Sequence, residues 1–287
     1  MKTRAENIVV NARAPRVPGS GWRAWDKDGA MDLELSDAVI LITGGTDGLG
    51  SALADGLIRE GARVAVCGRD PERVRTTQAR LASSGGEAIG VAADVTVPAD
   101  LERFVSVVAE QWGRIDGLVN NAGRSSAGRI EQVADEDWAY DIDLKVMAAV
   151  RLTRLVLPYL RAAQTGSIVN VLNIGARAPG VGSLPTAASR AAGLAITKAL
   201  SKELAPDNIR VNAVLIGFIE SSQATRRAEA RGVPLETVYA EGAARIPLGR
   251  VGKADEYADL VSYLLSKRSS FVTGTAINLD GGASPVI

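Results

Sequence analysis

The sequence predicts an α/β fold in a single domain, with a doubly wound parallel sheet of about seven strands and helices on both faces. Short apolar runs are typical of strands that are buried on both faces, and helical patterns separate one run from the next. This alternation implies right-handed crossovers, which place helices on both sides of the sheet. Strands are expected near 38–43, 63–67, 87–92, 115–120, 166–172, 209–215 and 275–279, and helices near 48–60, 71–83, 98–112, 135–163, 185–205 and 253–266.

The composition fits a protein with a large core, because 46% of the 287 residues are hydrophobic and 23% are charged. A formal net charge of zero gives no indication of a nucleic acid or an anionic membrane as partner. No apolar run approaches the roughly 18 residues of a membrane span. Cys67 is the only cysteine, which excludes an internal disulfide and favours a cytoplasmic protein. The absence of histidine excludes Ser-His-Asp and Cys-His catalysis, and no spacing of other ligands indicates a metal site.

Two segments differ from the regular alternation. Residues 1–34 are predicted to be an N-terminal extension, either a disordered tail or an arm whose Trp22 and Trp25 dock on the domain or on a neighbouring subunit. Residues 35–287 are predicted to form the domain. Within it, residues 219–247 are the least regular part, rich in small and charged residues, and their place between a strand and the final helix suits a substrate lid.

A glycine-rich turn links the first strand to the first helix. Glycines allow unusual backbone angles there, and without side chains the backbone can approach a pyrophosphate closely. The helix that follows presents unpaired N–H groups and a partial positive charge to that anion. The turn therefore predicts a dinucleotide site that includes Gly44, Thr46, Asp47, Gly48, Leu49 and Gly50.

Seven motifs occur in the order found in one known family. They are the glycine turn from Thr43 to Gly50, Ala93-Asp94-Val95-Thr96, Leu118-Val119-Asn120-Asn121-Ala122-Gly123, Ile209-Arg210-Val211-Asn212-Ala213, Gly217-Phe218-Ile219-Glu220-Ser221, Ile246-Pro247-Leu248-Gly249-Arg250 and Asp280-Gly281-Gly282. Across roughly residues 35–282 the chain thus resembles the short-chain dehydrogenase/reductase family, which has a Rossmann-type fold. The resemblance implies a nicotinamide cofactor, a small-molecule carbonyl or alcohol substrate, and a homo-oligomer, either a dimer or a tetramer.

The resemblance also implies a role for each cofactor residue. Asp94 and Val95 are expected to contact the adenine. The expected lining of the adenosine ribose and the cofactor channel is Asn121, Ala122 and Gly123.

Other positions concern the nicotinamide and the choice of cofactor. Ile219 is expected to meet the nicotinamide amide with its backbone, and Ser221 stands where the family often has a threonine that touches the amide or the phosphates. NAD sites place an acid at the end of the second strand, but glycine stands there in this chain and Arg69 follows. A guanidinium can pair with a 2′-phosphate through two hydrogen bonds, although Asp47 and Asp70 weaken its field. NADP(H) is therefore favoured over NAD(H), the alternative being that Arg69 is a solvated residue at the start of a helix.

The chemistry of the family depends on an asparagine, a serine, a tyrosine and a lysine. The resemblance places these roles on Lys145, Asn173, Thr186 and Arg190, so all four side chains differ while their spacing is kept. A threonine hydroxyl is a far weaker acid than the phenol of a tyrosine, whose ordinary pKa is about 10. The usual tyrosine mechanism is therefore not expected. Arg190 is still able to bond the cofactor ribose, and Asn173 is still able to donate to a substrate oxygen.

Lys145 has three alternative roles. Burial and a neighbouring Arg190 would lower its pKa, so that it acts as a general acid or base. Alternatively it pairs with Asp141, one helical turn earlier, or it joins Arg190 in binding an anionic group of the substrate. Three functions follow for the chain: an NADP(H)-linked oxidoreductase whose proton donor is Lys145 or a water held by Asn173 and Thr186; a catalytically silent homologue that binds cofactor or an active partner; or an enzyme of this fold for elimination, decarboxylation or isomerisation.

Overall fold

The computed structural model describes residues 31–287. The extension predicted over residues 1–34 therefore lies, except for its last four residues, outside the described part of the chain. Leu33 to Ile287 form one compact unit. No helix within residues 31–287 is long and apolar enough to cross a membrane.

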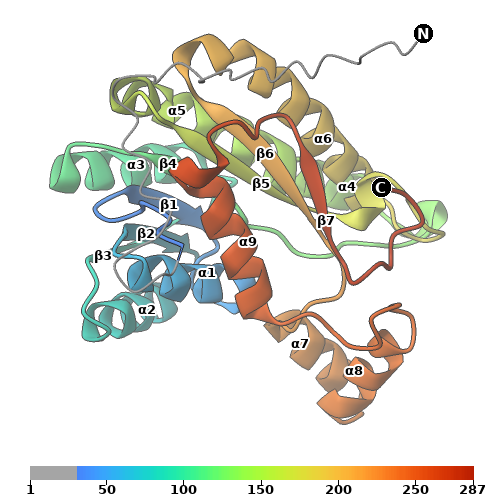
Figure 1. Ribbon diagram of the computed structural model, residues 1–287. Coiled ribbons are helices and arrows are strands. Elements are labelled where there is room, and N and C mark those ends of the chain that lie inside the picture. Colours follow the sequence, from blue (N-terminus) through green and yellow to red (C-terminus); the bar gives the residue numbers. More distant parts are fainter. Residues whose placement is uncertain (1–30) are drawn as a thin grey trace, which may run out of the picture. The chain divides into compact units, whose positions relative to one another are not determined.

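Seven parallel strands form one sheet in the order β3-β2-β1-β4-β5-β6-β7. This confirms the predicted fold class (Figure 1). The strand order reverses between β1 and β4, and ligands of such sheets bind outside the carboxyl ends of the strands at this switch point. The strands are β1 (Val39–Thr43), β2 (Arg63–Gly68), β3 (Ala88–Ala92), β4 (Gly117–Asn120), β5 (Ser167–Asn173), β6 (Arg210–Ile216) and β7 (Ala276–Leu279).

Helices cover both faces of the sheet. Buried side chains of α3 and α5 pack on one face, and those of α1 and α9 pack on the other. Side chains on successive strand positions alternate between these two layers, which explains why the strands are apolar on both faces. The helices are α1 (Gly48–Arg59), α2 (Pro71–Ser83), α3 (Pro98–Trp112), α4 (Asp135–Ile142), α5 (Ala148–Ala163), α6 (Thr186–Glu203), α7 (Ser222–Arg231), α8 (Leu235–Ala243) and α9 (Ala254–Leu265).

The helix predicted over 135–163 is interrupted. A π-helical turn, Asp143–Met147, separates α4 from α5. Such turns are frequent at functional sites, because the wider turn re-aims the side chains that it carries. Lys145 lies in this turn and is buried.

The segment expected to be irregular, residues 219–247, instead contains α7 and α8. Their apolar side chains pack together, with Ala224, Ala228 and Val238 buried beside Phe218 and Tyr239. The two helices lie together beyond the carboxyl end of β6 (Figure 1).

The glycine turn is held by close backbone contacts. Gly44 and Gly48 have φ angles of 65° and 50°, which favour glycine. Asn121 Nδ2 donates to the carbonyl oxygens of Thr43 and Gly44 at 2.9 and 3.2 Å, and the hydroxyl of buried Tyr257 donates to Asn121 Oδ1 at 3.2 Å. The turn is thus fixed from β4 and from α9.

Substituting Gly50 tests this close packing. A Cβ atom at position 50 would overlap the carbonyl oxygen of Gly44 and lie 2.6 Å from Asn121 Nδ2. Gly50→Ala is expected to lower the free energy of unfolding by ~1–3 kcal/mol, the usual cost of overpacking. Chemical denaturation of the wild-type protein and the variant measures this change in the free energy of unfolding. Gly180→Ala is the control, because a Cβ atom there would meet no described atom within 4 Å. Equal midpoints for the two variants would contradict the account.

Candidate active site

The residues predicted to bind cofactor come together at the carboxyl ends of β1 and β4. Thr43 Oγ1 accepts hydrogen bonds from the backbone N–H groups of Asn121 and Ala122, at 3.0 and 2.9 Å. A Cβ atom on Gly48 would lie 3.6 Å from Ser221 Cβ, so the turn also adjoins the segment after β6. Two strands and the start of α7 therefore converge on the glycine turn.

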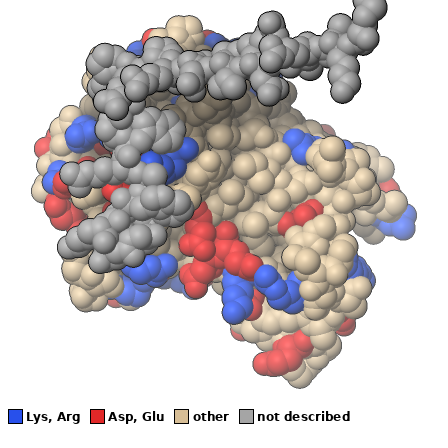
Figure 2. Space-filling view, viewed as in Figure 1, with Lys and Arg blue, Asp and Glu red and all other residues tan. Residues whose placement is uncertain are grey.

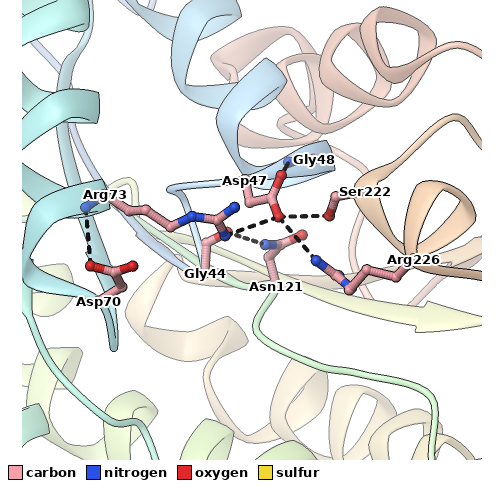
Figure 3. A network of polar contacts seen from close by, with 8 residues as sticks. All are labelled: Gly44, Asp47, Gly48, Asp70, Arg73, Asn121, Ser222 and Arg226. Atoms are coloured by element: carbon pink, nitrogen blue, oxygen red, sulfur yellow. Dashed lines mark hydrogen bonds and ion pairs between the residues drawn. The ribbon is translucent and has the colours of Figure 1, made fainter. Parts of the chain in front are cut away.

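Asp47 connects the glycine turn to α7 (Figure 3). Its Oδ1 accepts from the N–H of Gly48 at 2.7 Å and caps α1, and its Oδ2 accepts from Ser222 Oγ at 2.6 Å. Arg73 of α2 and Arg226 of α7 lie 3.4 and 3.6 Å from the same oxygen. Partial burial raises the pKa of Asp47, but these hydrogen bonds and charges together hold it below its usual range. Ser222, Arg73 and Arg226 were not predicted from the sequence, although Ser222 directly follows a predicted site residue.

Arg69 and Asp70 follow the end of β2. Asp70 caps α2 by accepting from the N–H groups of Glu72 and Arg73, at 2.9 and 3.3 Å. Arg69 donates to the Tyr140 hydroxyl at 3.4 Å, and the Arg124 guanidinium lies 4.7 Å from the centre of the Tyr140 ring. Within residues 31–287, Arg69 has no ion-pair partner, so its charge is not neutralised locally.

The predicted adenine contacts lie after β3. Asp94 Oδ1 accepts from the N–H and the hydroxyl of Thr96, at 2.9 and 2.8 Å, and the N–H of Asp94 donates to Asp100 Oδ2 at 2.8 Å. Val95 is buried in the core. The Asp94 carboxylate therefore stabilises the turn that follows β3.

Lys145 lies at the centre of a buried polar cluster. Its ammonium group forms an ion pair with Asp141, and neither side chain is exposed to solvent. Lys145 Nζ also donates to Thr186 Oγ1 at 2.9 Å. Ser189 Oγ donates to the other oxygen of Asp141 at 2.6 Å, and the N–H of Ser126 donates to Thr186 Oγ1 at 3.1 Å. The structure thus brings two of the four predicted catalytic residues into direct contact, and it shows the pairing with Asp141 that was one of the three alternatives for Lys145.

Ser126 and Ser189 were not predicted as members of this cluster. Ser189 follows Thr186 by three residues, which places both on one side of α6. That spacing could have identified Ser189 from the sequence. Ser126 contributes only its backbone N–H group, which no residue type signals.

The two cations of the cluster have lowered pKa values. Burial is the main cause for Lys145, whose pKa falls to about 8; the charges of Arg190 and Arg124 lower it further, and Asp141 opposes the shift. Burial likewise lowers the pKa of Arg190 to about 10, again opposed by Asp141. The pKa of Lys145 thus lies closer to neutral pH than that of Arg190.

Arg190 reaches from α6 to the sheet. Its Nη1 donates to the carbonyl oxygen of Val171 at 2.6 Å, and a Cβ atom on Gly123 would lie 2.5 Å from its Nη2. The guanidinium thus packs directly on Gly123, and a side chain there would displace it. Arg190 and Lys145 line one small cavity of about 20 Å³, together with Asn120 and Asn170. A cavity of this size has room for one water-sized molecule.

Asn173, at the end of β5, faces a different space. It lines a cavity of about 360 Å³ between the sheet and the helices α7 and α8. Its buried Oδ1 atom has no hydrogen-bond partner among residues 31–287. No hydrogen bond joins Asn173 to Lys145 or Thr186 in this part of the chain. Asn173 thus lines a different cavity from Lys145 and Arg190, and Thr186 is in the lining of neither.

The residues at the glycine turn fit a dinucleotide. The backbone is tight there, since a Cβ on Gly44 would lie 3.1 Å from the Cα of Ala122 and one on Gly50 would overlap the carbonyl oxygen of Gly44. The turn leads directly into the N-terminus of α1. These features form a cradle for a pyrophosphate. No group of three or more acidic or cysteine side chains that could hold a metal ion occurs among the described residues.

Comparisons with known proteins agree with this geometry. Residues 44–284 match a family model described as enoyl-(acyl carrier protein) reductase. A putative ketoacyl reductase of Streptomyces coelicolor is 38% identical over 250 residues, which cover 85% of this chain and 96% of that protein.

Two solved structures are also similar. L-sorbose reductase from Gluconobacter frateurii, complexed with NADPH and L-sorbose, has a TM-score of 0.85 and 32% identity, and the match covers 90% of this chain and all of that one. A short-chain oxidoreductase from Pseudomonas aeruginosa, described as containing an atypical catalytic center, has a TM-score of 0.83 and 34% identity, covering 88% of this chain and 99% of the other. The chain belongs to the short-chain dehydrogenase/reductase family of oxidoreductases.

Proposed function

We propose that this chain is an NADP(H)-linked oxidoreductase that interconverts a carbonyl and an alcohol on a small molecule, with Lys145 as the proton donor and Thr186 as its relay. The hydrogen bond of 2.9 Å from Lys145 Nζ to Thr186 Oγ1 carries the proposal, because Thr186 stands where the family has its tyrosine. The similar structure from Pseudomonas aeruginosa, with its atypical catalytic center, supports an altered residue set within the family.

The contacts of Thr186 orient its hydroxyl group. The oxygen accepts from Lys145 Nζ and from the N–H of Ser126, which uses both of its lone pairs. Its own hydrogen is therefore free to be donated to a substrate oxygen. Thr186 passes that proton outward and receives another from Lys145, so the threonine never needs to hold a negative charge.

The environment of Lys145 suits a proton donor. A pKa of about 8 leaves both protonation states populated near neutral pH, which is the range in which a general acid or base works best. Asp141 holds the ammonium group beside Thr186. A water in the small cavity lined by Lys145, Asn120 and Asn170 would return a proton to the lysine after each turnover. The bound cofactor supplies the hydride for the carbonyl carbon.

The charges around β2 favour NADP(H) over NAD(H). Glycine ends β2 where an NAD site has the acid that holds the ribose hydroxyls. Asp47 is engaged through both carboxylate oxygens, and Asp70 caps α2 through Oδ1. Arg69 has no ion-pair partner among residues 31–287, and Tyr140 restrains it at 3.4 Å. A guanidinium held in this way would pair with a 2′-phosphate.

Removing either partner of the relay is expected to stop catalysis. Lys145→Met and Thr186→Val should each lower kcat for carbonyl reduction by ~10²–10⁴-fold, the usual contribution of a positioned acid. Thr186→Ser, which keeps the hydroxyl, should retain most of the activity. Affinity for NADPH, measured by fluorescence titration, should change little in all three variants. Lys202→Met, at an exposed position of α6, is the control, and unchanged turnover in Lys145→Met would refute the relay.

The direction of the pH dependence follows from the lowered pKa of Lys145. Reduction needs the protonated lysine, so its rate should fall as pH rises through about 8, whereas alcohol oxidation needs the neutral lysine and its rate should rise over the same range. Profiles of kcat against pH in both directions measure this. Lys145→Arg keeps the charge but cannot release a proton, so any residual activity should lose that inflection. The same inflection in Lys145→Arg would assign it to another group.

Arg69 is expected to set the choice of cofactor. Arg69→Gln removes a charged donor, and a hydrogen bond to a charged group contributes about 1.5–3 kcal/mol, so the Kd for NADPH should rise by roughly 10–100-fold. The Kd for NADH should stay nearly constant. Arg75→Gln, on an exposed ion pair of α2, is the matched control. Equal losses for the two cofactors would contradict a role in recognising the 2′-phosphate.

A further inference from the structure

The larger cavity has the form of a substrate site. Its volume is about 360 Å³, within the range of small-molecule pockets. Asn173 lies on its wall with an unpartnered acceptor oxygen. The apolar part of the wall comes from β5, β6, α8 and the segments that follow them, and consists of Ile174, Ile216, Phe218, Val238 and Ile246.

The side of this cavity that α7 and α8 form, within the segment predicted to be a lid, carries unpaired positive charge. Arg227 of α7 and Arg245, just after α8, both line the cavity. Neither side chain has a hydrogen-bond or ion-pair partner among residues 31–287. The one acidic side chain on the wall, Glu241, is bound by Arg231 through two bonds of 2.7 and 2.8 Å.

Three arginines therefore surround one carboxylate. The hydrogen bonds from Arg231 are the main cause of a lowered pKa at Glu241, and the charges of Arg227 and Arg245 lower it further. Glu241 is thus ionised and neutralised by Arg231, which leaves two positive charges in excess. The other acids of the lid, Glu220, Glu229 and Glu236, do not line the cavity.

This local excess is distinct from the overall charge of the chain, which is zero. On the face drawn in Figure 2, acidic and basic side chains are mixed among neutral ones. The cavity differs from this mixed surface because two guanidinium groups without an ion-pair partner among residues 31–287 line it together. Arginine presents its donors in a planar fork that matches the oxygens of a carboxylate or a phosphate.

We infer that the substrate carries an anionic group, a carboxylate or a phosphate, which Arg227 and Arg245 bind at the lid side of the cavity while an apolar body fills its middle. The inference rests on the proposed function in that it takes this cavity as the substrate site. A Cβ atom on Gly175 of the cavity wall would lie 4.0 Å from the Cβ of Ala187, so the cavity adjoins the start of α6, where Thr186 lies. The inference assigns the anion to the lid helices, and not to the buried pair of Lys145 and Asp141, whose charges already neutralise each other.

Calorimetric titration with non-reacting probes tests the inference. Hexanoate, hexyl phosphate and hexanamide share an apolar chain and differ at the head group, so the comparison separates charge from hydrophobic burial and carboxylate from phosphate. Both anions should bind roughly tenfold tighter than the amide, and rising salt should weaken their binding alone. In the double variant Arg227→Gln/Arg245→Gln the anions should lose roughly tenfold in affinity, while hexanamide should bind as before.

Arg154→Gln is the matched control, since it removes one exposed arginine of α5 with no ion-pair partner in the described part of the chain. The inference is overturned if hexanamide binds as well as the anions, or if the double variant binds the anions unchanged. Turnover separates this outcome from the proposed function. If the anions bind through the arginines but no carbonyl is reduced, only the proposed function is contradicted. If carbonyls are reduced with no preference for anionic substrates, only this inference is contradicted.

Discussion

A lysine and an aspartate that are both buried away from water share one stretch of helix beside the predicted cofactor site. Burying a single charge is costly, and removing one partner of a buried pair typically costs about 3–5 kcal/mol. Lys145 therefore depends on Asp141, and Asp141 depends in turn on the ammonium group and on the Ser189 hydroxyl. The π-helical turn carries Lys145 into this position, and a threonine at 186 supplies the hydroxyl that accepts from it. In the function that we propose, this buried ion pair and the Thr186 hydroxyl take the place of the tyrosine that the family usually uses.

The sequence predicted the layers of the fold more fully than the details of the site. Strands such as β1 and β5 are apolar on both faces because helices cover both sides of the sheet, so their pattern determines the fold class. The π-helical turn was missed, since one extra residue in a helix leaves no periodic signal over so short a stretch. The helices α7 and α8 were missed because they bury few apolar side chains, most of them alanines.

At the site, contacts between residues that are close in sequence could be predicted, and contacts between distant residues could not. The pairing of Lys145 with Asp141 follows from a spacing of four residues on a helix, and it was one of three alternatives. The hydrogen bond from Lys145 to Thr186 joins residues 41 positions apart, and that from Ser222 to Asp47 joins residues 175 positions apart, so neither could be read from local patterns. The unpaired charge of Arg227 and Arg245 could likewise not be predicted, because it depends on the ion pair between Arg231 and Glu241, which only the structure shows.

The central claim is that Lys145 is a buried lysine with a lowered pKa. It is tested most directly by NMR titration of the protein with ¹³C-labelled lysine side chains, with the resonance of Lys145 assigned by its loss in Lys145→Arg. The account predicts a titration midpoint at about pH 8 for this resonance. A midpoint near the ordinary lysine value of about 10.4 would show a fully charged structural ion pair and would contradict the account.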